Sequence, residues 1–174
     1  DLWARKKGLL GKTTGIKFFN IYGPNEHHKG DMRSVVHKAF EQVRDSSKIS
    51  LFKSYRSEYA DGEQKRDFFY VKDAADIVLH LLNKNATGVY NVGSGRARSW
   101  NDLARAIFAA MGKEPNIEYV DMPEHLRDRY QYFTQAETGK LLSTGYSGKP
   151  LSLEDAVRDY VQNYLIPGKY LGEE

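Results

Sequence analysis

Short apolar runs alternate along the chain with longer stretches whose apolar residues recur at helical spacing. Runs rich in β-branched and aromatic residues predict buried strands at 14–23, 48–54, 67–71, 88–93 and 116–123. Apolar residues three and four apart predict a helix over 32–44, with a core face of Met32, Val35, Val36, Ala39, Phe40 and Val43. Strands that alternate with helices indicate an α/β fold.

Polar residues mark where further helices begin and end. Asp73 precedes a second helical pattern and is expected to cap it, with an inner face of Ile77, Val78, Leu81 and Leu82. An acceptor followed three residues later by a carboxylate predicts helix starts at Ser99 with Asp102, Thr134 with Glu137, and Ser152 with Asp155. Gly112 and Gly145 are expected to end two of these helices.

The first residues predict the end of a helix. Leu2 and Trp3 are followed by basic residues and then by Gly8 and Gly11, which is typical of a helix C-terminus. We therefore expect residues 1–174 to be a single piece of a longer protein.

Composition and charge narrow the classes of function. The 174 residues suffice for one domain with a core, and a net charge of +3 with interleaved signs argues against nucleic-acid binding. No apolar run approaches the ~20 residues of a membrane span, and no signal-peptide pattern opens the chain. Cysteine is absent, which excludes disulfides and thiolate metal sites and is compatible with a cytoplasmic protein.

A glycine turn follows the strand 88–93 in YNVGSGRARS, residues 90–99. Gly93 and Gly95 suggest either a tight connection to the next helix or a phosphate-binding loop. A complete dinucleotide fingerprint needs a third glycine where Arg98 stands. We favour the tight connection and expect no dinucleotide turn in this chain.

Three histidines invite a metal-site interpretation. Adjacent side chains such as His27 and His28 diverge, and no further ligand stands at a helpful spacing, so we expect exposed loop histidines and no metal. His37 falls outside the apolar face of its predicted helix, and we expect it to be solvated.

Lys29 lies just past the carboxyl end of the strand 14–23, where α/β sheets bind ligands. It is interpreted as an anion clamp or a base, or else as a solvated loop lysine. Asp31 and Lys38 lie about two helical turns apart and are expected to share one edge of the helix 32–44. That edge would either rim the ligand crevice or carry a surface ion pair.

Two further residues have chemistry suited to a ligand. Arg66 immediately precedes the strand 67–71, and its planar guanidinium suits a diphosphate or carboxylate; the alternative is a structural bridge to Asp67 or another acid. Tyr130, in RYQYFTQAE, can stack on a ligand or pack internally.

Taken in order, the segments FFNIYGP, HKGDM, KRDFFYVKDAAD, YNVGSG and RYQYFTQAE resemble the C-terminal half of extended short-chain dehydrogenases/reductases acting on nucleotide sugars. Within that family, HKG and RYQYFTQAE resemble the ADP-L-glycero-D-manno-heptose 6-epimerases. The resemblance implies a Rossmann-like α/β fold, in which the last cofactor-domain strands interleave with a small α/β substrate-binding portion. It also implies a missing N-terminal half with the glycine-rich dinucleotide turn and a Tyr-x-x-x-Lys pair.

The resemblance further implies an NADP-dependent inversion of carbon 6 in an ADP-linked heptose, by transient oxidation and re-reduction, and a homo-oligomer. The missing tyrosine and Lys29 would be the two acid/base groups, with Lys29 and the backbone of Ile21 also touching the cofactor. The residues implied to contact substrate are Asn20, Asp31, Lys38, Phe52, Arg66 and Tyr130.

The sequence departs from the family pattern at Asp31, where a small hydroxyl residue is common, and at Lys38, where histidine is common. The loop 53–65 also differs. Two alternatives therefore stay open. The first is another nucleotide-sugar 4-epimerase or dehydratase of the same superfamily, and the second is a sugar-nucleotide-binding fragment without activity of its own.

Overall fold

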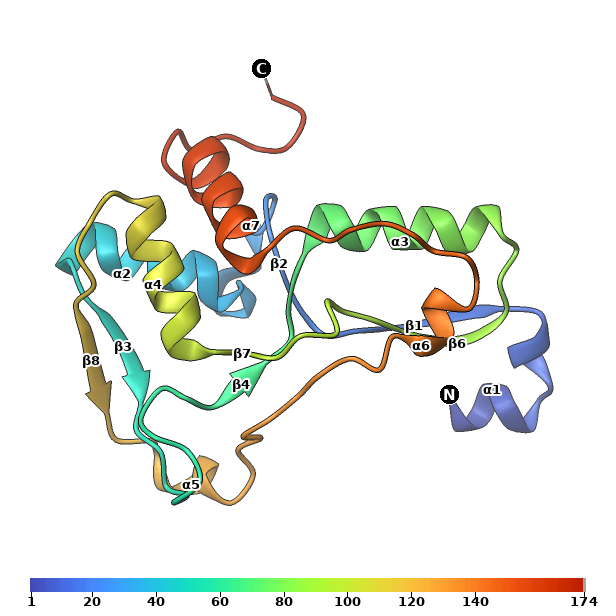
Figure 1. Cartoon of the computed structure of the whole chain (residues 1–174), viewed down its shortest axis with the longest axis horizontal. Helices are drawn as coiled ribbons and strands as arrows, with labels where there is room; N and C mark the ends of the chain where they lie inside the picture. Colours follow the sequence, from blue (N-terminus) through green and yellow to red (C-terminus); the bar gives the residue numbers. More distant parts are fainter. Residues whose placement is uncertain (174) are drawn as a thin grey trace.

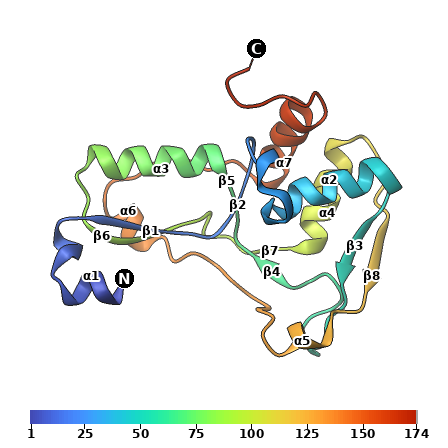
Figure 2. The ribbon, with the colours of Figure 1, turned by 180° about the vertical axis from the view of Figure 1, so that it is seen from behind.

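The computed structural model describes residues 1–173, whose helices and short strands surround two hydrophobic cores (Figures 1 and 2). The strands are β1 (Thr14–Phe18), β2 (Asn20–Tyr22), β3 (Ile49–Phe52), β4 (Lys65–Arg66), β5 (Phe68–Tyr70), β6 (Gly88–Val92), β7 (Arg98–Ser99) and β8 (Ile117–Val120). The α-helices are α1 (Leu2–Lys6), α2 (Val35–Ser46), α3 (Val71–Asn83), α4 (Trp100–Ala110), α5 (Glu124–Arg127), α6 (Gly139–Leu142) and α7 (Leu153–Tyr160). Other helical turns are the 3₁₀ segments η1 (Leu9–Gly11) and η2 (His27–Met32) and the π-helical η3 (Val161–Leu165). The expected α/β class is confirmed.

The strands pair two by two. β1 lies parallel to β6, β2 to β5 and β3 to β8, whereas β4 and β7 are antiparallel. The helix α3 connects β5, the partner of β2, to β6, the partner of β1. Figure 1 shows α3 running along the β1–β6 pair.

The predicted strand over 14–23 is two strands with different partners. The Phe19 N–H donates to the Val92 carbonyl at 3.1 Å, and the next N–H, on Asn20, donates to the Asp67 carbonyl at 3.1 Å. The chain therefore leaves β6 and joins β5 between two consecutive residues. Side-chain patterning could not show this, because both halves are apolar and extended.

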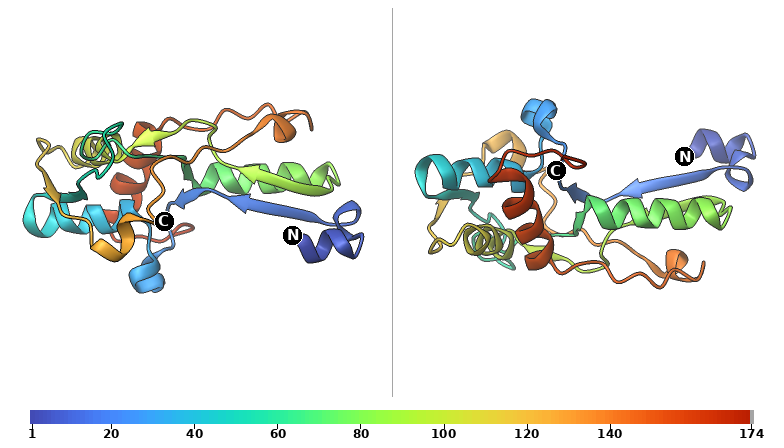
Figure 3. Two further views of the ribbon diagram at one scale, coloured as in Figure 1. Left: turned by 90° about the horizontal axis from the view of Figure 1, so that it is seen from below. Right: turned by 90° about the horizontal axis from the view of Figure 1, so that it is seen from above.

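β5 separates the two cores because side chains alternate along a strand. Phe68 and Tyr70 belong to the larger core, which α2, α4 and α7 complete. Phe69 belongs to the smaller core, which lies between α3, β6 and α6. The two cores form opposite ends of an elongated molecule (Figure 3).

The helix α2 begins at Val35, and Ser34 caps it by accepting the His37 N–H. Met32 therefore lies in η2 before the helix and is 85% exposed, so its predicted place on the core face is wrong. Val35, at the first position of the helix, is also exposed. The other predicted core positions are buried: Val36, Ala39, Phe40 and Val43.

The helix α3 begins before the predicted cap. Tyr70 is its N-cap and Asp73 stands in the first turn, where its carboxylate accepts the Leu151 N–H at 3.1 Å. Asp73 thus ties α3 to the segment before α7 rather than capping α3. Of the expected inner face, Ile77 and Leu81 are buried, whereas Leu82 is 67% exposed.

Two of the three caps predicted at serine or threonine are confirmed. Ser99 and Asp102 form a reciprocal capping box on α4, and the Ser152 hydroxyl accepts the Asp155 N–H on α7. The cap predicted at Thr134 is wrong, because its N–H donates to the Lys65 carbonyl in an extended segment and the next helix begins at Gly139.

The glycine stops agree with the sequence. Gly112 and Gly145 follow α4 and α6 with φ of +64° and +83°. At the start of the chain, α1 ends at Lys6 before Gly8, which has a φ of +66°. No helix within residues 1–173 is long and apolar enough to cross a bilayer.

Candidate functional site

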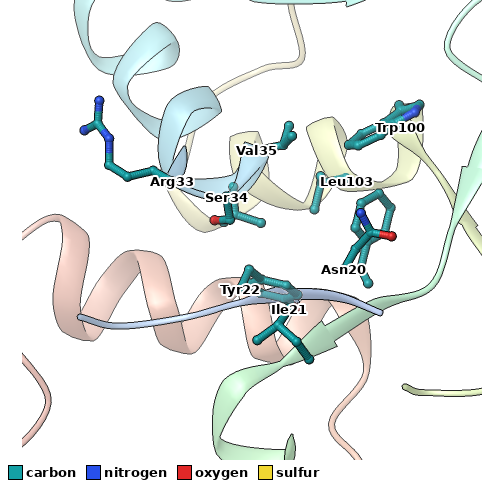
Figure 4. A pocket seen from close by; sticks show the side chains of 10 residues that line it. Asn20, Ile21, Tyr22, Arg33, Ser34, Val35, Trp100 and Leu103 are labelled. Carbon is teal, nitrogen blue, oxygen red and sulfur yellow. The ribbon is translucent and has the colours of Figure 1, made fainter. Parts of the chain in front are cut away.

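A cavity opens where the chain changes strand partners. Its volume is about 220 Å³, and β2 supplies Asn20, Ile21 and Tyr22 to its wall. Figure 4 shows the Asn20 amide at the end of the cavity near Trp100, whereas the guanidinium of Arg33 is directed away. Neighbouring strands that diverge at their carboxyl ends leave such crevices in α/β sheets.

A second cavity, of about 350 Å³, brings together three of the predicted ligand residues. Lys38 of α2, Phe52 of β3 and Tyr130 line it, together with Gln42 and Ser50. Val35 and Trp100 line both this cavity and the one beside Asn20. The two cavities therefore share a wall, and we call them the Phe52 cavity and the Asn20 cavity.

Arg66 is a buried cation close to two aromatic rings. Its guanidinium carbon lies 5.2 Å from the Tyr130 ring centroid and 5.8 Å from the Trp100 centroid. One nitrogen donates to the Lys65 carbonyl at 2.8 Å, and no carboxylate within residues 1–173 forms an ion pair with it. Burial lowers the pKa of Arg66. An unpaired buried guanidinium can receive an anion.

Tyr130 connects Arg66 to the Phe52 cavity. Its ring lies edge-on to Phe52, with centroids 6.4 Å apart, and edge-on to Tyr132 at 5.5 Å. Tyr130 and Arg66 also line a small open cavity with Arg129 and Gln131. A flat aromatic ligand group and a neighbouring anion could therefore both be held here.

Lys29 lies on the opposite side of Ile21. It is exposed in η2 and lines an apolar cavity of about 740 Å³ with Ile21, Phe18 and Phe19. Ile21 is thus the residue shared by this cavity and the Asn20 cavity. Lys29 and Asn20 line adjoining cavities, and Arg66, which lies next to Trp100, lines neither of them.

Asp31 and Lys38 do not share a helix edge. Asp31 lies in η2, three residues before α2 is capped, and Lys38 lies within α2. Gly30, with φ of +52° and ψ of −126°, breaks the helical path between Lys29 and Asp31. Because Asp31 is not part of α2, the spacing of seven residues does not place it on the same helix edge as Lys38. Asp31 is exposed, whereas Lys38 lines the Phe52 cavity.

The glycine turn binds an anion that belongs to the protein itself. The Asp67 carboxylate is fully buried and accepts the N–H groups of Ser94, Gly95 and Ala136 at 2.8–2.9 Å. The Ser94 hydroxyl donates to it at 2.7 Å. A Cβ on Gly93 would lie 2.9 Å from this carboxylate, which explains the glycine. The turn is structural, and Asp67 is not the partner of Arg66.

His37 is buried rather than solvated. It is 4% exposed, and its Nδ1 lies 3.1 Å from the Tyr160 hydroxyl of α7. Burial lowers the pKa of His37 to about 4. Periodicity missed this position because α7, which covers it, is distant in sequence. His27, which was expected to be exposed, is half-buried, and its ring centroid lies 5.1 Å from that of His37. His28 is exposed as expected.

Sequence reasoning missed Trp100 and Arg129. Trp100 packs edge-on against Phe68 at 5.0 Å and forms the wall between the two cavities. The sequence could have indicated Trp100, because it directly follows the glycine turn and the predicted helix cap Ser99. Arg129 had no such signal, because it stands among several arginines in an irregular segment.

Comparisons with known proteins agree with this architecture. The family model described as "NAD dependent epimerase/dehydratase family" matches residues 3–93. A curated relative from Nitratidesulfovibrio vulgaris (strain Hildenborough), named ADP-L-glycero-D-manno-heptose-6-epimerase, is 53% identical over 95% of this chain and 51% of its own length. The chain thus spans about half the length of this relative.

Solved structures show the same fold. The Helicobacter pylori ADP-L-glycero-D-manno-heptose-6-epimerase superposes with a TM-score of 0.71 and 29% identity, covering 87% of this chain and 44% of that one. The Thermus thermophilus UDP-glucose 4-epimerase, in complex with NAD, superposes with a TM-score of 0.70 and 24% identity, covering 92% and 48%. The Rossmann-like architecture expected from the sequence motifs is therefore confirmed, and the chain belongs to the NAD dependent epimerase/dehydratase family.

Proposed function

We propose that this chain is the substrate-binding part of an NADP-dependent ADP-L-glycero-D-manno-heptose 6-epimerase. The observation that carries the proposal is the convergence of Phe52, Tyr130, Lys38 and the unpaired Arg66 around adjoining cavities. The 53% identity to a relative of that name supports the choice of substrate. In this assignment the chain is one C-terminal piece, and a separate N-terminal half completes the enzyme.

The nucleotide end of the ligand is assigned to the Phe52 cavity. Phe52 and Tyr130 offer aromatic surfaces for a base, while Lys38, Gln42 and Ser50 offer polar contacts. The Arg66 guanidinium next to Tyr130 would then bind the diphosphate, because a planar fork matches phosphate oxygens. The negative ligand would neutralise a charge that the fold leaves unpaired.

The sugar is assigned to the Asn20 cavity. The Asn20 amide can both donate to and accept from sugar hydroxyls at the edge of this space. The reacting carbon is assigned to the part of the sugar that extends past Ile21 into the adjoining cavity, where Lys29 would hold or move the proton of its hydroxyl. Asp31, exposed in the same turn, would contact only a part of the sugar that extends past the cavity.

The chain fits one end of a nicotinamide cofactor. Ile21 and Lys29 border an apolar cavity suited to a flat ring, but the glycine turn 93–95 is already filled by the Asp67 carboxylate. Residues 1–173 therefore offer no cradle of this kind for the cofactor phosphates. When bound, NADP supplies hydride acceptance and return at the sugar carbon.

An N-terminal half is the expected partner. Phe18 at the end of β1 is 53% exposed, and Leu79 and Leu82 on α3 are 57% and 67% exposed. Such a surface fits burial against a further polypeptide, which would carry the dinucleotide turn and the catalytic tyrosine.

Calorimetry on residues 1–174 tests the ligand assignment directly. ADP-linked sugars should bind more tightly than UDP- or GDP-linked sugars, and NADP should not be retained, because the nucleotide site lies within this chain and the cofactor phosphate site does not. Tight NADP binding would contradict the proposal. Preference for a UDP-sugar would instead favour a 4-epimerase or dehydratase of the same family.

The role of Lys29 is tested in a full-length polypeptide made by joining this chain to the N-terminal half of the Nitratidesulfovibrio relative. Lys29→Met should slow interconversion of the two 6-epimers by about 100-fold or more, because a proton-transfer group is lost. Lys12→Met, at an exposed position, is the matched control. Near-normal turnover of the Lys29 variant would remove its catalytic role.

A further inference from the structure

The turn that carries Lys29 has little packing of its own. We define the Lys29 turn as residues 25–33, which include η2 and the break at Gly30. Lys29, Gly30, Asp31 and Met32 are all exposed, and η2 contains no buried residue. Its internal bonds are short-range, such as the Lys29 N–H to the Glu26 carbonyl at 2.9 Å. Anchors elsewhere must therefore fix where the turn lies.

Two anchors come from the body of the molecule. The Glu26 side chain is buried, and its carboxylate accepts the Ser34 N–H at 3.0 Å, next to the start of α2. The His27 ring lies edge-on against His37 at 5.1 Å, and His37 contacts the fully buried Tyr160. These contacts fix one face of the turn against α2 and α7.

The opposite anchor comes from the C-terminal tail, residues 167–173. The Tyr170 ring lies 4.6 Å from the His27 ring, and the Leu171 N–H donates to the Asn25 side-chain carbonyl at 2.9 Å. Tyr170 and Leu171, which are consecutive in the tail, thus contact His27 and Asn25 at the two ends of the segment 25–27. Figure 3 shows the tail beside this turn.

The tail is itself ordered for this contact. The Glu173 N–H donates to the Tyr170 carbonyl at 3.2 Å, and the Tyr170 N–H donates to the Glu173 carboxylate at 2.8 Å. Asn25 has a φ of +70°, a left-handed conformation that asparagine adopts more often than most other non-glycine residues, and its side-chain carbonyl accepts the Leu171 N–H of the tail.

We propose that the C-terminal tail holds the Lys29 turn in place, with Tyr170 as a positioning residue for the Lys29 ammonium. Tyr170 acts through the ring of His27, two residues before Lys29. It lines neither the Asn20 cavity nor the cavity beside Lys29. The inference rests on the proposed function for the use made of Lys29, but the mechanical contact can be measured without it.

Amide hydrogen exchange on residues 1–174 tests the contact. In Tyr170→Ala, the amides of Lys29 and Arg33 should exchange about tenfold faster, because the turn opens locally, while amides within α4 keep their rates. Tyr170→Phe, which keeps the ring, should restore slow exchange. Ile166→Ala, an exposed position just before the tail, is the matched control.

Two outcomes of this experiment would overturn the inference. Unchanged exchange at Lys29 and Arg33 in Tyr170→Ala would show that the tail does not hold the turn. Equal acceleration in α4 would show that Tyr170 serves general stability only. The Tyr170→Phe comparison separates loss of the ring from loss of the hydroxyl.

The joined full-length polypeptide separates this inference from the proposed function. Tyr170→Ala should lower kcat about tenfold with KM for the ADP-sugar unchanged, since no tail residue lines the Phe52 cavity or the Asn20 cavity. If Tyr170→Ala loosens the turn but Lys29→Met leaves turnover intact, the proposed function fails and the positioning role stands. If Lys29→Met abolishes turnover but Tyr170→Ala changes neither exchange nor kcat, the positioning role alone fails.

Discussion

Arg66 carries a buried positive charge that no carboxylate neutralises within residues 1–173. The two neighbouring aromatic rings offset part of its desolvation, but each is a weaker partner than a carboxylate. A residue held in this way costs stability in the free protein. The cost is understandable if the charge is kept for an anionic ligand.

Arg66→Met should therefore separate stability from binding. We expect the free energy of unfolding in urea to rise by about 1 kcal/mol, because an unpaired buried charge is replaced by a methionine. Affinity for ADP should fall by about tenfold or more, because charge-assisted bonds to the diphosphate are lost. Arg105→Met, at an exposed site on α4, should change neither quantity appreciably. Parallel loss of stability and binding would contradict this account.

Asp67 should behave in the opposite way. Asp67→Asn would place an NH₂ group against a site where backbone N–H groups of Ser94, Gly95 and Ala136 converge. We expect a loss of about 2–4 kcal/mol in the free energy of urea unfolding. Asp45→Asn, at an exposed pair with Arg44, should leave the free energy of unfolding nearly unchanged. Equal effects would show that the buried network is unimportant.

Residue types were more predictable from the sequence than their partners. Lys38, Phe52 and Tyr130 line one cavity, and Arg66 lies beside the Tyr130 ring, while the ligand contacts that the resemblance implies for them stay predictions. The partner of Asp67 could not be found, because its donors lie 27 to 69 residues further along the chain. Only the folded chain brings those backbone groups together.

At the scale of elements, α2 shows why a polar position can be part of a core. His37 faces α7, where the Tyr160 hydroxyl is its partner, and Glu41 lies 3.7 Å from its other ring nitrogen. The spacing of apolar residues predicted the helix correctly, but it wrongly placed His37 on the solvent-exposed face instead of the buried face. A polar residue that finds a hydrogen bond inside the protein is invisible to such patterns.

The low pKa of His37 predicts an acid-sensitive packing of α2 on α7. The unfolded chain would bind a proton at a pKa near 6.5, whereas burial lowers the pKa in the folded state to about 4. Between these values the unfolded state binds more protons, so stability should fall as pH decreases from 6.5 to 4. Urea midpoints at pH 7, 5.5 and 4.5 measure this slope. His37→Gln should flatten it, whereas His125→Gln, at an exposed position, should not.

Helix starts could be predicted from the sequence where a side chain caps its own helix. The prediction failed where the residue forms a hydrogen bond with a distant strand instead. Ser99 and Ser152 act locally, and both predictions are confirmed. Thr134 has the same local pattern, but β4 captures its backbone N–H through Lys65. A local signal therefore loses when a strand partner lies within reach.

At the scale of the whole molecule, the two cores differ in how completely they are covered. The larger core has helices on several sides, whereas the smaller one is covered by α3 and α6 beside the β1–β6 pair. Exposed Phe18, Leu79 and Leu82 surround that smaller core. The molecule thus has one end with a well-covered core and one end with exposed large apolar side chains, where we propose that a further polypeptide half packs.

Mixing this chain with the N-terminal half of the Nitratidesulfovibrio relative should form a complex detectable by sedimentation. Binding of a hydrophobic dye to the chain should fall on mixing, because the apolar region around Phe18 and Leu79 becomes buried. Phe18→Glu should prevent the complex, whereas Leu171→Glu, on the tail at the other core, should not. A complex unaffected by Phe18→Glu would place the contact elsewhere.

The change of partner between Phe19 and Asn20 has a consequence for how this protein can vary. Phe19 is hydrogen-bonded to β6, and Asn20, the next residue, is hydrogen-bonded to the residue before β5. Ile21 follows directly and lines two cavities. Inserting or deleting a single residue here would turn Ile21 to the opposite face and uncouple both spaces together. Changes in ligand preference should therefore arise in the distant walls at Phe52 and Trp100, and leave this junction at constant length.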